Sequence, residues 1–72
     1  MEQVILTARE KEVLKRICLN DKDIAKQLQI APTTVKTYVA NLRNKFVVES
    51  KILLLYEALK GGYIKVEEII TK

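Results

Sequence analysis

The chain has 72 residues, of which 49% are hydrophobic and 31% charged, and its formal net charge is +4. This length allows one small domain with a compact core, which argues against an enclosed cofactor pocket or a large catalytic cleft. Histidine is absent and Cys18 is the only cysteine, so an intramolecular disulfide, a zinc site of Cys and His ligands and histidine-based catalysis are all excluded.

The remaining composition favours a cytoplasmic protein without enzymatic activity. No apolar run approaches the roughly 18 residues that a membrane span needs, and no signal-like leader opens the sequence. No pair of the carboxylates falls in an apolar setting that would tune its pKa for catalysis. We therefore expect no enzyme, no cofactor, no metal and no membrane contact.

Glycine and proline are scarce, so few turns are expected. The sequence therefore predicts helices with short connections. The first helix is predicted over 8–18. It begins after Thr7, which fits a capping box with Glu10. Apolar residues then recur at helical spacing, and at the end of this pattern Cys18 is expected to be an inert thiol in the core.

A second helix is predicted over 21–28, because Asn20 and Asp21 favour helix caps and break the preceding pattern. A turn follows at 29–31. A third helix is predicted over 32–46, with its proline at the first position, where a missing N–H costs nothing. Two helices joined by about three residues form a helix-turn-helix.

The outer face of the third helix is basic and free of acids, since no Asp or Glu lies between Asp23 and Glu49. At about 100° per residue, one face of this helix carries the apolar residues Val35, Val39, Leu42 and Phe46. The opposite face carries Thr33, Lys36, Thr37, Ala40 and Asn44. Small polar side chains beside a few bases suit a helix that enters a nucleic-acid groove. The alternative is an ordinary solvated surface.

The fourth helix is predicted over 50–60, with Ser50 as its N-cap and Gly61 as its stop. Its core stripe is Leu54, Leu55, Ala58 and Leu59, with Ile52 at the margin. Leu53 and Tyr56 then project to the other side, which favours a partner surface. The tail, 63–72, alternates apolar and charged residues weakly, so we expect a short, frayed extension.

These spaced segments together resemble the LuxR/FixJ/GerE-type DNA-binding domain over about 6–64. The resemblance is carried by Leu6-Thr7-Ala8-Arg9-Glu10 with Glu12-Val13-Leu14, by Lys22-Asp23-Ile24-Ala25 with Leu28 and Ile30, by Thr34-Val35-Lys36, Asn41-Leu42 and Lys45-Phe46, and by Val48, Lys51, Leu54, Leu55 and Ala58. It implies that the third helix lies in the DNA major groove and that the fourth mediates dimerisation. Members usually carry an upstream domain, so the chain looks like the stand-alone, GerE-like arrangement, which Met1 favours, or like an excised C-terminal domain.

The sequence departs from the family pattern at four places. The connection between the first two helices, Cys18-Leu19-Asn20-Asp21, is about two residues shorter than usual and lacks glycine. Ala31 replaces the usual Ser or Thr, so the third helix lacks a capping hydroxyl. Tyr38 stands where the family has histidine, and Lys51 stands where it has arginine.

Taken together, these patterns predict an all-α, four-helix protein that binds double-stranded DNA as a homodimer and regulates transcription. The expected base contacts are Thr33, Lys36, Thr37 and Ala40, the last two through their methyl groups. The expected contacts with the DNA backbone are Lys22, Thr34, Tyr38, Asn41, Arg43, Asn44 and Lys45. The expected dimer interface is formed by Leu53 and Tyr56.

Simpler roles exist for several of these residues. Lys36 has the alternative role of an ordinary solvated lysine, and Ala40 that of a residue chosen for its helix propensity. Thr33 and Thr34 could serve only as helix caps, and Tyr38 could lie at the edge of the core. The competing function is a small helical module that pairs with a larger regulator through Leu53 and Tyr56. RNA binding is a weaker alternative, because aromatic residues are few and no stacking platform is evident.

Overall fold

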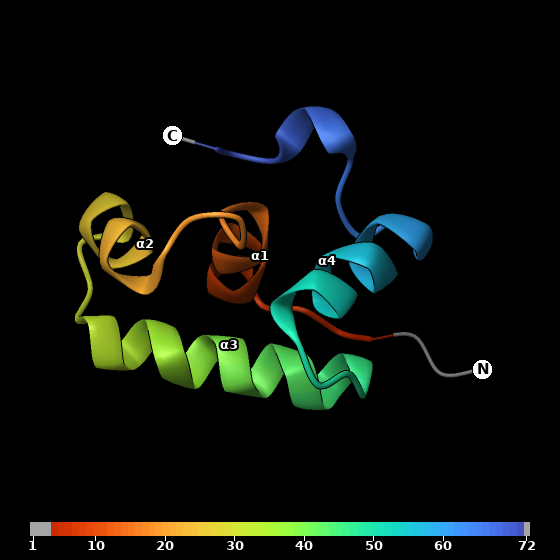
Figure 1. The fold of residues 1–72 in the computed structure, drawn as a ribbon, viewed down its shortest axis with the longest axis horizontal. Helices are drawn as coiled ribbons and strands as arrows, with labels where there is room; N and C mark the ends of the chain where they lie inside the picture. The colour runs from red at the N-terminus through yellow and green to blue at the C-terminus, as the bar shows by residue number, and fades with distance from the viewer. Residues whose placement is uncertain (1–3, 72) are drawn as a thin grey trace.

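The computed structural model describes residues 4–71, which form helices and no strand. In chain order, the elements are α1 (Ala8–Lys15), α2 (Asp21–Leu28), α3 (Pro32–Phe46), α4 (Lys51–Lys60) and a short 3-10 helix, η1 (Val66–Glu68) (Figure 1). The predicted all-α architecture with four α-helices is therefore confirmed. No helix among these residues is long and apolar enough to cross a bilayer.

Side-chain caps start three of the four α-helices, at the residues that the sequence predicted. The Glu10 N–H donates to Thr7 Oγ1 at 3.1 Å, and Thr7 N–H donates to Glu10 Oε1 at 3.0 Å, which completes the capping box. Asn20 and Ser50 accept backbone N–H groups of α2 and α4 in the same way. The fourth case, Ala31 before α3, makes no side-chain cap, as expected for an alanine.

The first helix ends at Lys15, so the prediction that it extends to residue 18 is wrong. Beyond Lys15 the backbone tightens, because the N–H groups of Arg16 and Ile17 donate to carbonyls three residues earlier. Such turns advance about 120° per residue instead of about 100°. Ile17 and Leu19 thereby both reach the core, and Cys18 between them is exposed. The predicted core position of Cys18 is wrong for this reason.

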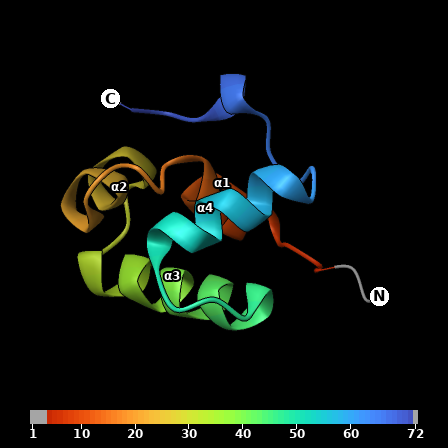
Figure 2. The same cartoon turned by 45° about the vertical axis from the view of Figure 1, so that its right-hand side comes forward.

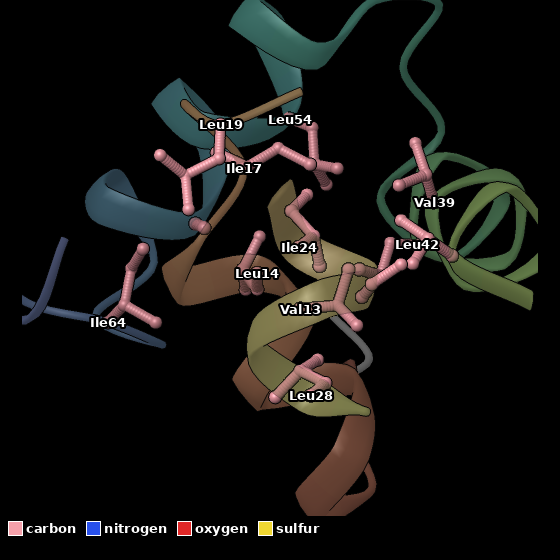
Figure 3. Close-up of a cluster of buried hydrophobic side chains, with 13 residues drawn as sticks. Val13, Leu14, Ile17, Leu19, Ile24, Leu28, Val39, Leu42, Leu54 and Ile64 are labelled. Carbon is pink, nitrogen blue, oxygen red and sulfur yellow. The ribbon is translucent and has the colours of Figure 1, made fainter. Parts of the chain in front are cut away.

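The core lies where α1, α2, α3 and α4 meet (Figure 3). Each helix contributes at least one fully buried apolar side chain, the largest being Val13, Leu14, Ile24, Val35, Leu42 and Leu54. Helix α3 contacts each of the other three α-helices. Its predicted inner face is confirmed, since Val35, Val39 and Leu42 are buried and Phe46 packs at the edge.

The turn between α2 and α3 spans residues 29–31 and contains no glycine. Gln29 closes α2 with a left-handed backbone (φ 58°), and the Ile30 N–H donates to the Ala25 carbonyl at 3.0 Å. Pro32 then occupies the first turn of α3. Val47 ends α3 in the same left-handed region (φ 55°), which side chains seldom adopt. These two caps give α2 and α3 the boundaries that the sequence predicted.

The C-terminal tail packs on the body of the protein, so the prediction of a frayed extension is wrong for the described part. Ile64 is only 2% exposed. The ring of Tyr63 meets the ring of Phe46 edge-on, with 5.1 Å between centroids. Its hydroxyl accepts the Val4 N–H at 2.9 Å, which joins the two ends of the chain.

The tail then returns to the end of α1 (Figures 1 and 2). The Ile70 N–H donates to the Lys15 carbonyl at 2.9 Å, which gives the last residue of α1 a backbone partner. The carboxylate of Glu68, in η1, lies 3.5 Å from Lys15 Nζ. The tail therefore stabilises the end of a helix that is only two turns long.

Candidate nucleic-acid interface

One side of α3 is left uncovered by the rest of the described structure. In Figures 1 and 2, α3 lies along one edge of the molecule, and α1, α2 and α4 all lie on its other side. The contacts agree, since Val35, Val39 and Leu42 face inward. A helix buried along one stripe presents the opposite stripe to solvent or to a partner.

The predicted contact residues of α3 fall into two groups. Those on the outer stripe and its near shoulder are exposed: Thr33, Thr34, Lys36, Thr37, Asn41 and Asn44. Ala40, Tyr38 and Arg43 are half-buried, and Tyr38 packs against the core. Lys45, near the end of α3, is exposed but lies outside the strip. Lys22, the predicted contact outside α3, is exposed on α2. The exposed group forms one continuous strip along α3, because its members recur at helical spacing.

The only charged residue of this strip is Lys36, and its charge is positive. No acidic residue occurs in α3, and the nearest acids along the chain are Asp23 and Glu49. Among residues 4–71, Lys36 has neither a hydrogen bond nor an ion pair, so its ammonium is available to a ligand. A helix with this face is attractive to an anionic groove.

Thr37 is fixed by its own helix. Its hydroxyl donates to the Thr33 carbonyl oxygen, one turn earlier, at 3.2 Å. Thr33 and Thr34 lie in the first turn, where the side-chain cap is missing and only backbone bonds to Ala31 are formed. This end of α3 therefore presents the two threonine hydroxyls beside the N–H of Thr33, since the N–H groups of Thr34 and Val35 already donate to Ala31.

The two basic residues near the end of α3 contact the protein itself. Lys45 Nζ donates to Glu10 Oε1 at 2.6 Å and to the Ile5 carbonyl at 2.9 Å. Arg43 donates to the Glu49 carbonyl at 3.1 Å. The sequence did not predict these contacts, because Glu10 fits the cap of α1 and both bases fit ordinary surface charges.

Glu10 is a buried carboxylate held by both α1 and α3, and only 5% of its surface is exposed. Burial alone would raise the pKa of Glu10, but the hydrogen bonds from Lys45 and Thr7 and the charge of Lys45 outweigh it, and the pKa is lowered from its usual 4.5. The ionised form is therefore the one that the fold stabilises.

The pH dependence of stability follows from this shift. A carboxyl whose pKa is lower in the folded than in the unfolded chain stabilises the fold above the unfolded pKa, and this contribution is lost as the pH falls through the folded pKa. We expect the free energy of unfolding to decrease below about pH 4.5. Glu10→Gln should cost about 1–3 kcal/mol at pH 7, because Lys45 loses a buried charged partner, and should flatten this decrease.

Urea unfolding of both proteins between pH 3 and pH 7 measures this effect. Glu67→Gln is the matched control, since Glu67 is exposed. An equally steep acid loss in Glu10→Gln and in the parent would mean that other carboxylates determine it.

The surface of α4 carries a second uncovered patch. Leu53 is 49% and Tyr56 58% exposed, whereas Leu54 and Ala58 on the inner side are fully buried. The predicted outward direction of Leu53 and Tyr56 is confirmed. Ile52, which the sequence placed at the margin of the core, is 81% exposed, and Leu55 and Leu59 are half-buried. The apolar patch therefore includes Ile52 as well.

Comparison with known proteins identifies this arrangement. The family described as "Bacterial regulatory proteins, luxR family" matches residues 4–58, which include α1 to α3 and most of α4. The chain belongs to this LuxR family. The predicted resemblance is therefore confirmed. Residues 59–71, with the packed tail, lie beyond the matched segment.

Several curated relatives of the chain are transcriptional regulators by name. The chain is 41% identical over 58 residues to the probable transcriptional regulatory protein NarL of Mycobacterium tuberculosis. The aligned segment is 78% of this chain and 27% of that protein. It is 36% identical over 62 residues to the transcriptional regulatory protein DesR of Bacillus subtilis, and this alignment covers 83% of the chain and 31% of DesR. The chain thus spans about a third of these relatives or less. No solved structure matched significantly.

Proposed function

We propose that this LuxR-family chain binds double-stranded DNA sequence-specifically and regulates transcription, with α3 as the helix that enters the major groove. The observation that carries the proposal is the uncovered, acid-free strip of α3 with the available ammonium of Lys36. A major groove about 12 Å wide admits one α-helix with short side chains. The names of the relatives support the same function.

The proposed roles follow position along the strip. Thr33, Lys36, Thr37 and Ala40 contact base edges, and Lys36 suits the O6 and N7 acceptors of guanine. The DNA backbone is contacted by Lys22, Thr34, Tyr38, Asn41, Arg43, Asn44 and Lys45. Lys45 and Arg43 would first give up the internal contacts described above, so their share of the binding energy is expected to be smaller than that of Lys36.

Selection of bound duplexes from a random pool, followed by titration at several salt concentrations, tests the proposal. We expect one enriched motif and a strong salt dependence, because lysines that contact phosphates displace counterions. About six phosphate contacts per dimer give a slope near −5 for log affinity against log salt. Absence of an enriched motif, or affinity that does not change with salt, would contradict DNA binding by this face.

Substitution of Lys36 tests the direction of α3 in the groove. Lys36→Ala is expected to cost on the order of 1–3 kcal/mol of binding and to relax the preference at one base pair of the motif. Lys65→Ala is the matched control, because Lys65 is an exposed lysine in the tail. Affinity and preference that match the parent in Lys36→Ala would show that another face of the protein binds.

Lys45→Ala separates stability from recognition. It is expected to weaken binding to all sequences alike, since its proposed contact is with phosphate. Because Lys45 also pairs with Glu10, this variant should unfold at lower urea, whereas Lys36→Ala should not. Comparison of urea midpoints therefore shows which part of the Lys45 effect comes from the fold.

We also propose that the chain binds as a homodimer through Leu53 and Tyr56, with Ile52 beside them. Their exposure favours a partner surface, since three large apolar residues on one short helix exceed the usual scatter. A two-fold dimer covers the same patch on both copies. A larger regulator as the partner of this patch is the competing function, and independent binding of the parent protein to two half-sites would favour it.

A further inference from the structure

We propose that Thr37 selects a thymine, and that it does so through its methyl group and not through its hydroxyl. The inference rests on the proposed function, since it names the base that one position of α3 prefers. It starts from the hydrogen bond between Thr37 Oγ1 and the Thr33 carbonyl oxygen, 3.2 Å long and internal to α3.

This hydrogen bond determines what Thr37 offers to a ligand. A hydroxyl has one proton to donate, and in Thr37 the helix backbone already accepts it. The N7 and O6 acceptors of a purine would have to compete with that carbonyl. The hydroxyl oxygen keeps its acceptor lone pairs, which only the amino group of adenine or cytosine can use, so the valine and serine variants below are needed to separate the two groups. The methyl, the other substituent on Cβ, takes no part in this hydrogen bond. Thr37 is exposed, so this methyl is available at the surface of the strip.

Ala40 extends the apolar character of this position. Residues three apart on a helix are neighbours on one face, so the methyls of Thr37 and Ala40 lie on the same stripe. Lys36 precedes Thr37 and Asn41 follows Ala40, and both offer polar groups to the adjacent bases. The strip therefore has a small apolar centre between two polar ends.

Thymine is the one standard base whose edge in the major groove matches an apolar centre. Its C5-methyl projects into the groove, whereas the other bases present only donors or acceptors there apart from ring carbons. Contact between the methyls of Thr37 and thymine removes both from water. The gain is comparable to burial of one methylene group, which changes affinity about fourfold.

Two variants of Thr37 separate the methyl from the hydroxyl. Thr37→Val keeps the methyl, removes the hydroxyl and retains a β-branched side chain in the helix. Thr37→Ser keeps the hydroxyl and removes the methyl. Each protein is titrated with the duplex selected from the random pool and with duplexes in which single thymines are replaced by deoxyuridine, which lacks only the C5-methyl. Circular dichroism checks that both variants keep the helical content of the parent.

We expect one thymine per half-site at which deoxyuridine weakens the parent and Thr37→Val about fourfold each, while Thr37→Ser is unaffected by the same change. If Thr37→Ser keeps the sensitivity to deoxyuridine, or if Thr37→Val loses it, the inference is wrong and the hydroxyl or another residue reads the base. If the parent binds its motif and no thymine responds, the inference is wrong while the proposed function stands. A pool without an enriched motif overturns the proposed function itself.

Discussion

A chain that ends at Gly62 is expected to lose about 3–5 kcal/mol of stability, which is most of what a domain of this size has. Deletion removes Ile64, a side chain that is 2% exposed, and burial of such a residue is typically worth about 2–5 kcal/mol when the cavity left behind is included. It also removes the Tyr63 ring from Phe46 and the backbone bond that Ile70 donates to Lys15. Urea unfolding followed by circular dichroism measures the loss.

Two further variants identify which contact of the tail is responsible. Ile64→Ala should account for more than half of the loss, because it empties the buried site and leaves the chain intact. Val66→Ala is the control, since Val66 is 70% exposed in the same segment. If the shortened chain unfolds at the same urea concentration as the parent, the tail contributes nothing and the folded unit ends with α4.

Leu53→Glu is expected to leave the fold intact and to abolish cooperative binding to a duplex with two half-sites. Leu53 is 49% exposed, so the monomer tolerates a charge at this position. In a two-fold interface the same carboxylate would be buried with no opposite charge to pair with it. Two recognition helices held about 34 Å apart match successive turns of the duplex. Linking two binding events in this way raises affinity by about 10²–10⁴-fold, so the variant should bind the double site hardly better than a single one.

Gel-shift titrations of single and double half-sites measure the cooperativity. Val66→Glu is the matched control, because it places the same charge on an exposed apolar residue outside α4. Undiminished cooperativity in Leu53→Glu would remove α4 from the dimer interface. If the parent also binds the two half-sites independently, as Leu53→Glu is expected to do, the α4 patch is better explained by a larger partner protein.

Local chemistry made α2 and α3 predictable from the sequence. Asn20 offers a capping oxygen and Pro32 has no N–H to lose, so each start is determined by a few adjacent atoms. The apolar spacing of α3 then determined its inner face, and its outer face followed by elimination. The elements that the structure confirms are those whose boundaries and faces are determined by residues within one or two helical turns.

The features that the sequence did not predict depend on contacts between distant residues. Cys18 leaves the core because Ile17 and Leu19 both enter it, which no single helical period describes. Lys45 pairs with Glu10 across 35 positions of the chain. The left-handed residues Gln29 and Val47 occur without glycine, so their turns carry no sequence signal. The tail packs because Ile64 finds a site that other helices build.

The exposure of Cys18 has a practical consequence. It is the only thiol in the chain, and the segment that contains it, between α1 and α2, lies on the side of the molecule away from α3 (Figures 1 and 2). A single maleimide-linked nitroxide would therefore attach to each copy without covering the strip of α3. In an assembly of two copies on one duplex, pulsed electron paramagnetic resonance between two such labels would report how the copies are oriented.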